Sequence, residues 1–184
     1  MTEYRLLTIW CIEAPLEAVY AAIHDTPIWP VWWPAVKKVE EVAAGDPDGL
    51  NSVLRYSWQG KFPYRVVFQV RATHIERLVA IEGTVEGDLE GIGRWHFSRQ
   101  EGASVVRYEW HVRSTRWWMN LIAPFARAMF IRNHGMVMKQ GAERLAARLG
   151  APLVSQENID LMTQTAPPMR APARVDPEFK VPRS

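Results

Sequence analysis

The chain has 184 residues, of which 48% are hydrophobic and 23% charged, and its formal net charge is +2. This length is sufficient for one domain with a substantial core, and the composition is that of an ordinary globular protein. The small surplus of arginine forms no basic block, so nucleic-acid binding is not expected. No stretch approaches the roughly 20 apolar residues that cross a bilayer, so no transmembrane segment is expected either.

The N-terminal stretch MTEYRLLTIW lacks the apolar run of a signal peptide, because Glu3 and Arg5 interrupt it. Cys11 is the single cysteine and cannot form an internal disulfide, which favours a reducing compartment. Its neighbours Trp10 and Ile12 indicate a buried strand residue rather than a reactive thiol. These features together predict a cytoplasmic protein.

The first third of the chain predicts a strand followed by two short helices. Residues 3–14 are rich in β-branched and apolar side chains, which is typical of a strand. Pro15 then begins a helix that extends to about residue 25. Residues 27–35 follow as a short helical turn that two prolines prevent from continuing.

The middle of the chain alternates between apolar and polar residues, which predicts an antiparallel sheet with one solvated face. The five alternating segments are 51–58, 64–73, 79–87, 93–98 and 105–113, preceded by a DPDG turn at 46–49. Their apolar face is bulky and consists of Tyr56, Trp58, Tyr64, Phe68, Trp95, Tyr108 and Trp110. A hairpin turn at 100–103 would place Trp95 opposite Tyr108 and Arg94 opposite Glu109, which pairs ring with ring and opposite charges.

Residues 114–150 predict one long helix, with Ser114 or Thr115 as its cap, a kink or new first turn at Pro124, and an end at Gly150. Its expected buried stripe is Trp118, Ile122, Phe125, Met129, Asn133, Met136, Val137, Gln140 and Gly141, with His134 turned away. Residues 151–184 hold six of the 13 prolines and predict an extended tail without helix or sheet ladder. The expected organisation is therefore a domain over 1–150 and a tail over 151–184.

These elements predict an α+β fold in which a curved antiparallel sheet wraps the C-terminal helix and two short helices close one end. Aromatic walls with few polar atoms are typical of a small-molecule cavity, here between sheet and helix, although rings of this kind also fill ordinary cores. We found no metal-binding or nucleotide-binding motif, and His96 and His111 fall on the solvated face. No metal and no cofactor are therefore expected.

The stretches IWPVWWPAVKKVE and NHGMVMKQGAERLAARLG, together with the order of the elements, resemble the SRPBCC (START-like) superfamily. Within it the chain is most similar to the bacterial polyketide cyclase/dehydrase-like proteins, over residues 3–149. The resemblance implies a helix-grip fold with a deep pocket for hydrophobic ligands. Some members of the superfamily bind lipids, sterols or quinones, whereas others cyclise or dehydrate polyketides.

Three functions remain open at this point. The first is binding of a small hydrophobic ligand, such as an aromatic, polyketide, isoprenoid, quinone or lipid-like molecule. The expected contacts are Trp32, Trp33, Tyr56, Trp58, Tyr64, Phe68, Trp95, Tyr108, Trp110, Phe125, Met129, Asn133 and Met136. The second is a cofactor-free cyclase or dehydratase with Tyr56, Tyr108 and Asn133 as candidate catalytic groups. The third is a partner-binding protein acting through its tail, and the sequence leaves open whether the chain forms a homodimer.

The tryptophans of residues 27–35 have two interpretations. Trp29, Trp32 and Trp33 would either cap the pocket where the short helices meet the sheet, or anchor the short helix to the core.

Overall fold

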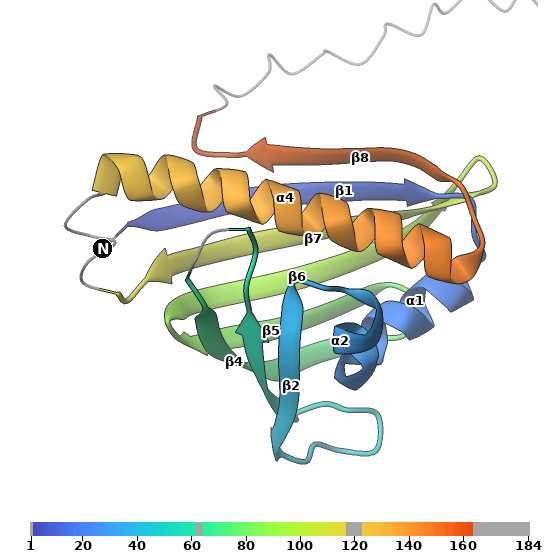
Figure 1. The fold of residues 1–184 in the computed structure, drawn as a ribbon. Coiled ribbons are helices and arrows are strands. Elements are labelled where there is room, and N and C mark those ends of the chain that lie inside the picture. The colour runs from blue at the N-terminus through green and yellow to red at the C-terminus, as the bar shows by residue number, and fades with distance from the viewer. Residues whose placement is uncertain (1, 62–63, 117–122, 164–184) are drawn as a thin grey trace, which may run out of the picture.

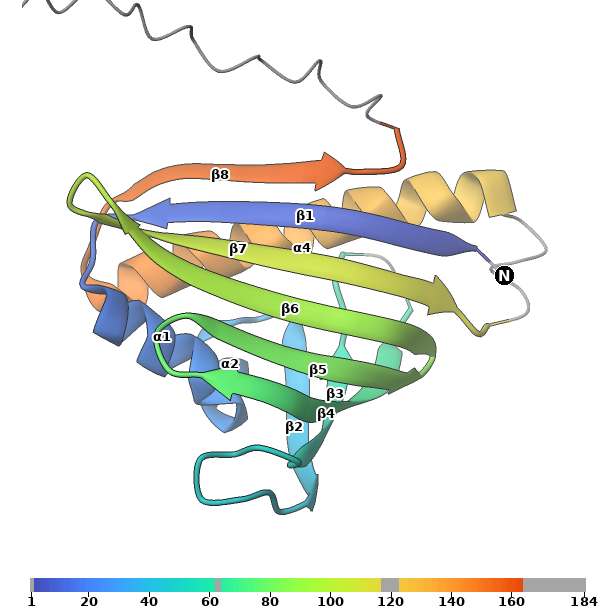
Figure 2. The same cartoon turned by 180° about the vertical axis from the view of Figure 1, so that it is seen from behind.

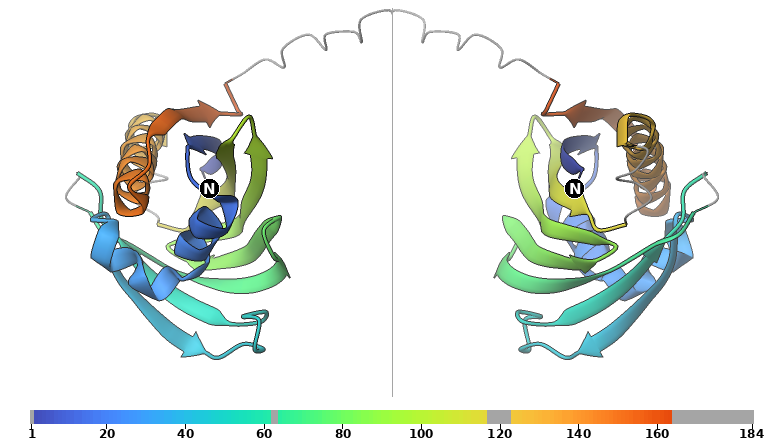
Figure 3. Two further views of the ribbon diagram at one scale, coloured as in Figure 1. Left: turned by 90° about the vertical axis from the view of Figure 1, so that its right-hand side faces the viewer. Right: turned by 90° about the vertical axis from the view of Figure 1, so that its left-hand side faces the viewer.

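In a computed structural model, the chain forms an eight-stranded antiparallel sheet that curves around one long helix (Figures 1 and 3). The structure describes residues 2–61, 64–116 and 123–163, without the side chains of 123–126. The described elements in chain order are β1 (Glu3–Ile12), α1 (Leu16–His24), η1 (Thr26–Ile28), α2 (Trp29–Trp32), β2 (Val36–Ala43), β3 (Val53–Trp58), β4 (Val66–Glu76), β5 (Ala80–Gly87), β6 (Leu89–Gln100), β7 (Ala103–Ser114), α4 (Ala123–Leu149) and β8 (Leu153–Asp160). This confirms the predicted α+β helix-grip architecture.

The strand order in the sheet is β2-β3-β4-β5-β6-β7-β1-β8, and the strands lie side by side when seen from behind (Figure 2). The predicted hairpin register is confirmed, because Trp95 lies opposite Tyr108 and Arg94 opposite Glu109. The rings of Trp95 and Tyr108 stack with centroids 4.0 Å apart. The alternating pattern therefore fixed both the faces of these strands and their pairing.

The segment after Gly150 differs from the prediction of an extended tail without a sheet ladder. Leu153–Asp160 forms β8, which pairs antiparallel with β1. Both Asp160 carboxylate oxygens accept hydrogen bonds from Arg127 of α4, at 3.0 and 2.7 Å. The prediction was wrong here because the prolines cluster beyond residue 166, which leaves 153–160 with all its backbone N–H donors. Residues 164–184 lie outside the described part of the chain.

The described part of the long helix, α4, begins at Ala123, and residues 117–122 lie outside the description, so the predicted cap at Ser114 or Thr115 stays a prediction. Ser114 is the last residue of β7 and pairs with Leu89, and its Oγ accepts a hydrogen bond from the Arg116 backbone N–H at 3.3 Å. Thr115 donates a hydrogen bond from Oγ1 to the Gly87 carbonyl at 2.7 Å. Trp118, Ile122 and the side chain of Phe125 lie outside the described residues, while the predicted end of the helix at Gly150 (φ 61°) is confirmed.

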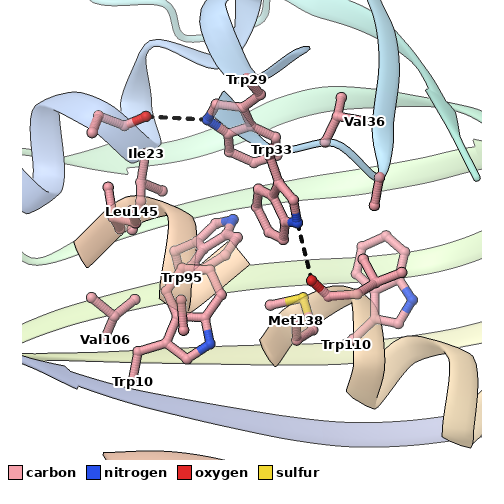
Figure 4. Packing of buried hydrophobic residues seen from close by; sticks show 14 of the residues in the cluster. Trp10, Ile23, Trp29, Trp33, Val36, Trp95, Val106, Trp110, Met138 and Leu145 are labelled. Atoms are coloured by element: carbon pink, nitrogen blue, oxygen red, sulfur yellow. Dashed lines mark hydrogen bonds between the residues drawn. The ribbon is translucent and has the colours of Figure 1, made fainter. Parts of the chain in front are cut away.

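The short helix α2 is fastened to the core by indole hydrogen bonds (Figure 4). Trp33, which is fully buried, donates from Nε1 to the Val137 carbonyl of α4 at 3.0 Å. Trp29 donates from Nε1 to the Ala22 carbonyl of α1 at 3.2 Å. The anchoring interpretation therefore holds for Trp33, which links the two short helices to the long one. No helix among the described residues is long and apolar enough to cross a membrane.

Candidate ligand-binding site

A cavity of about 510 Å³ lies between the concave face of the sheet, the end of α1 with η1, and the loop that joins β2 to β3. Its volume falls within the range of about 300–1,000 Å³ that is typical of small-molecule pockets. Seven aromatic side chains line it: Trp29, Tyr56, Trp58, Phe68, Trp95, Tyr108 and Trp110. The cavity therefore has the ring-rich wall that the alternating strands predicted.

Neighbouring rings hold one another in place around this cavity. Tyr56 stacks on Phe68 with centroids 5.6 Å apart, and Phe68 lies 5.6 Å from Trp110. Trp29 closes the wall from the side of α2, 5.9 Å from Tyr56. Aromatic pairs at these separations add stability beyond their buried area, so the wall is preformed.

One glycine makes the approach of two rings possible. A Cβ at Gly93 would lie 2.7 Å from Cζ3 of Trp110 and 3.2 Å from the Tyr108 hydroxyl oxygen. Ordinary carbon–carbon contacts are about 3.5–4.0 Å. Gly93 is therefore required for the present position of the two rings.

The outer edge of the cavity is acidic. Its exposed lining residues include Asp25, Glu41, Asp46 and Asp48 together with His24, and the described lining contains no lysine or arginine. Glu82 also borders the cavity, but its carboxylate binds Arg94 at 2.7 Å. Because like charges repel at the entrance, the cavity favours neutral over anionic ligands.

The tyrosines of the wall are neutral phenols at physiological pH. Burial raises the pKa of Tyr56 to about 12, against a smaller lowering by a hydrogen bond with Thr26. Burial also raises the pKa of Tyr108 well above 10, and the nearby Tyr56 adds to this. These groups can donate hydrogen bonds to a ligand but are unsuited to act as bases.

A smaller cavity of about 70 Å³ lies under α4. It shares Trp58, Phe68, Tyr108 and Trp110 with the larger one, so four rings line both cavities. Its polar lining consists of Tyr64, Asn133 and His134. We expected the main cavity between sheet and long helix, but none of the described residues of α4 lines the larger cavity.

The position of His134 contradicts the predicted helix stripe. Its Nε2 atom is buried, and burial lowers its pKa from 6.5 to about 4. His134 shares its helix face with the buried Val137, Met138 and Leu145, at spacings of three, four and eleven residues. Of the predicted stripe, Val137 and Gly141 are buried and Asn133 lines the small cavity, whereas Met129 and Met136 are only half-buried, so the buried face also includes His134 and Met138.

Residues 11–150 match a protein family described as polyketide cyclase / dehydrase and lipid transport. The chain belongs to this family. The predicted resemblance to the polyketide cyclase/dehydrase-like proteins is thereby confirmed.

Solved structures agree with this assignment at the level of the fold. A protein from Thermus thermophilus is 20% identical with a TM-score of 0.64, and the match covers 80% of this chain and 99% of that one. The Zhui aromatase/cyclase from a Streptomyces species is 12% identical with a TM-score of 0.63, over 81% and 94% of the two chains. A START superfamily protein from Mycobacterium smegmatis is 14% identical with a TM-score of 0.61, over 80% and 97%. No curated protein sequence gives a significant match.

The family fold brings most of the predicted site residues to the two cavities. Tyr56 and Trp95 line the large cavity, Tyr64 and Asn133 the small one, and Trp58, Phe68, Tyr108 and Trp110 both. Trp32, Trp33, Met129 and Met136 line neither cavity as far as the structure describes them, and Phe125 lies outside that description. Trp29, for which the sequence left a pocket role and an anchoring role open, lines the large cavity. Sequence reasoning missed His24 and His134 as site residues, although the helical spacing of His134 could have revealed it.

The histidines of this family member do not converge on a metal site in the described residues, where no group of three His, Cys, Asp or Glu side chains could hold an ion. His96 lies opposite Arg107 and His111 opposite Ile92, so the register of β6 and β7 separates them.

Proposed function

We propose that the protein binds a small, neutral, aromatic molecule in the 510 Å³ cavity. The observation that carries this proposal is the wall of seven aromatic rings around a space of ligand size. The family description, which combines polyketide enzymes with lipid transport, supports an apolar ligand of this kind.

Ring contacts and charge both favour this ligand class. Flat ligands can stack on or meet the edges of Trp29, Tyr56 and Trp95, which are already arranged in tilted and T-shaped pairs. The carboxylates at the entrance disfavour a ligand with a free carboxylate, such as a fatty acid. A neutral polycyclic or polyketide-like molecule therefore suits the cavity better.

Cyclase or dehydratase activity has weaker support than binding. Such chemistry needs an acid or base whose pKa suits proton transfer, and burial keeps Tyr56 and Tyr108 protonated far beyond neutral pH. Asn133, the third candidate, lies at the small cavity and has no titratable proton in the working range. Partner binding through the predicted tail over residues 151–184 stays a prediction.

Titration with the neutral dye N-phenyl-1-naphthylamine tests the proposal. We expect saturable fluorescence enhancement with one dye per chain. Ala72 lines the cavity, so Ala72→Phe would place a ring in the binding space and weaken dye binding at least tenfold. Thr73→Phe is the matched control, because Thr73 is the next residue on β4 and is exposed.

Both variants should keep the far-ultraviolet circular dichroism of the wild type, which verifies the fold. Absence of saturable binding to the wild type, or equal affinity of Ala72→Phe and Thr73→Phe, would refute the proposed site.

A further inference from the structure

The small cavity under α4 contains buried polar groups that the aromatic wall does not explain. Asn133 Oδ1 and His134 Nε2 both line it, are buried from solvent, and have no hydrogen-bond partner among the described residues. Leaving such groups unpaired is costly, and most buried polar side-chain atoms in proteins are paired. These two atoms therefore mark a place where a polar group can bind.

The local packing presents the Asn133 amide in a defined way. Burial raises the pKa of the Tyr64 phenol, and a hydrogen bond with Asn133 opposes this shift. The amide of Asn133 therefore lies beside the Tyr64 phenol, and its Oδ1 atom has no hydrogen-bond partner among the described residues. The absence of a side chain at Gly60 leaves room for this amide, because a Cβ there would meet Asn133 Oδ1 most closely and would lie 2.9 Å from Cγ.

The imidazole of His134 complements this acceptor. Because burial lowers its pKa to about 4, the ring is neutral at physiological pH and carries one N–H, which can reside on Nε2. With the buried and unpaired Nε1 of Trp58, the small cavity thus offers one acceptor and two donors without a net charge. A hydroxyl group can donate to the acceptor and accept from both donors, whereas a carbonyl oxygen would leave Asn133 Oδ1 unpaired and a charged group would be buried without a counter-ion.

The size of the cavity agrees with a group of this kind. Water occupies about 30 Å³ in the liquid, and a cavity that holds benzene measures about 150 Å³. The 70 Å³ space is therefore large enough for a hydroxyl and its carbon but too small for another ring. It adjoins the large cavity at the rings of Trp58, Phe68, Tyr108 and Trp110, which line both spaces, so a ligand that occupies both has to extend between these rings.

We propose that the small cavity binds a hydroxyl group of the ligand, with Asn133 Oδ1 accepting its hydrogen and His134 Nε2 donating to its oxygen. This inference rests on the proposed function, because the rings of the same ligand occupy the large cavity. It assigns the ligand to the class of hydroxylated aromatic molecules, in which a phenol or alcohol stands at the inner end.

Two dyes that differ by one hydroxyl test this assignment. The pair is N-phenyl-1-naphthylamine and its analogue with a para-hydroxyl on the phenyl ring, both measured by quenching of tryptophan fluorescence. A net gain of one or two hydrogen bonds predicts that the wild type binds the phenol about two- to tenfold more tightly. Asn133→Leu and His134→Phe should each reduce this affinity ratio to about one.

Arg132→Leu is the matched control, because Arg132 is adjacent on α4 but exposed, and it should keep the wild-type ratio. Two variants are used so that either one decides the question if the other fails to fold. If the wild type binds both dyes equally, or both site variants keep the wild-type preference, the hydroxyl assignment is overturned while the proposed function stands. If neither dye binds, the proposed function and this inference are both overturned.

Discussion

Two glycines in the same helix are expected to respond to alanine in opposite directions. At Gly141 a Cβ would lie 2.5 Å from Cε2 of Trp33, about 1 Å closer than an ordinary carbon–carbon contact. At Gly135 the nearest atom to a Cβ would be Asn158 Nδ2, at 3.6 Å, which is ordinary contact. Both positions lie inside α4, so the gain in helix propensity is the same, about 1 kcal/mol.

The Trp33 ring cannot easily yield to the added methyl group. It is fully buried, and its ring centroid lies 4.9 Å from that of Trp58 and 5.6 Å from that of Trp10. Its Nε1 also donates a hydrogen bond to the Val137 carbonyl. Overpacking of this kind costs about 1–3 kcal/mol, and stretching the indole hydrogen bond adds about 1 kcal/mol. After the gain in propensity, Gly141→Ala should destabilise the protein by about 1–3 kcal/mol, whereas Gly135→Ala should stabilise it by up to about 1 kcal/mol.

Urea unfolding followed by tryptophan fluorescence and circular dichroism measures both effects. With a slope of about 2 kcal/mol/M, a difference of about 2–4 kcal/mol separates the two midpoints by about 1–2 M. Equal midpoints for the two variants, or a Gly141→Ala protein as stable as the wild type, would refute the packing of Trp33 against α4.

Three further results are expected. The pKa of His134 is about 4 in the folded protein and about 6.5 in the unfolded chain. Between pH 6.5 and pH 4 only the unfolded state therefore binds this proton, so the free energy of unfolding should fall by up to about 3 kcal/mol as the pH falls through this range. His134→Gln should flatten the dependence of the urea midpoint on pH in this range, whereas His111→Gln, at an exposed position, should not. An unchanged slope in His134→Gln would contradict the burial of the His134 imidazole. Asp160→Asn should lower the free energy of unfolding by about 1–3 kcal/mol, because the Asp160 side chain is only 10% exposed and pairs with Arg127. Glu157→Gln, at an exposed position of the same strand, should change it by no more than about 0.5 kcal/mol. Similar thermal midpoints for the two variants would argue against the docking of β8. Finally, 8-anilinonaphthalene-1-sulfonate should bind at least tenfold more weakly than N-phenyl-1-naphthylamine in fluorescence titrations, because the sulfonate meets the entrance carboxylates, and the reverse order would rule out that electrostatic argument.

Much of the sheet could be predicted from local pattern alone. A period of two determines which residues share a face, and a short hairpin determines register, so the Trp95–Tyr108 pair followed from the sequence. Proline and glycine likewise determined where the short helices and the long helix end. The alternating pattern of the strands also predicted six of the seven rings around the large cavity. For the seventh, Trp29, the sequence left open whether it caps the pocket or anchors the short helix.

Other features depended on contacts between segments far apart in the chain. Strand β8 forms because β1 offers a free edge and Arg127 binds Asp160, and neither fact is visible in the segment itself. The burial of His134 depends on the rotation of α4 about its own axis relative to the sheet. Turning the helix by one residue, about 100°, would move His134 off the buried face.

The sequence by itself determined a curved sheet with an aromatic inner face and a long helix to cover it. Only the tertiary structure decided that the large cavity lies beside α1 and the β2–β3 loop, and that a small polar cavity lies under α4. The physical reason is that periodicity specifies which side chains face inward, whereas a cavity is the space that those side chains leave unfilled. That space depends on the curvature of the sheet and on the packing of every ring at once.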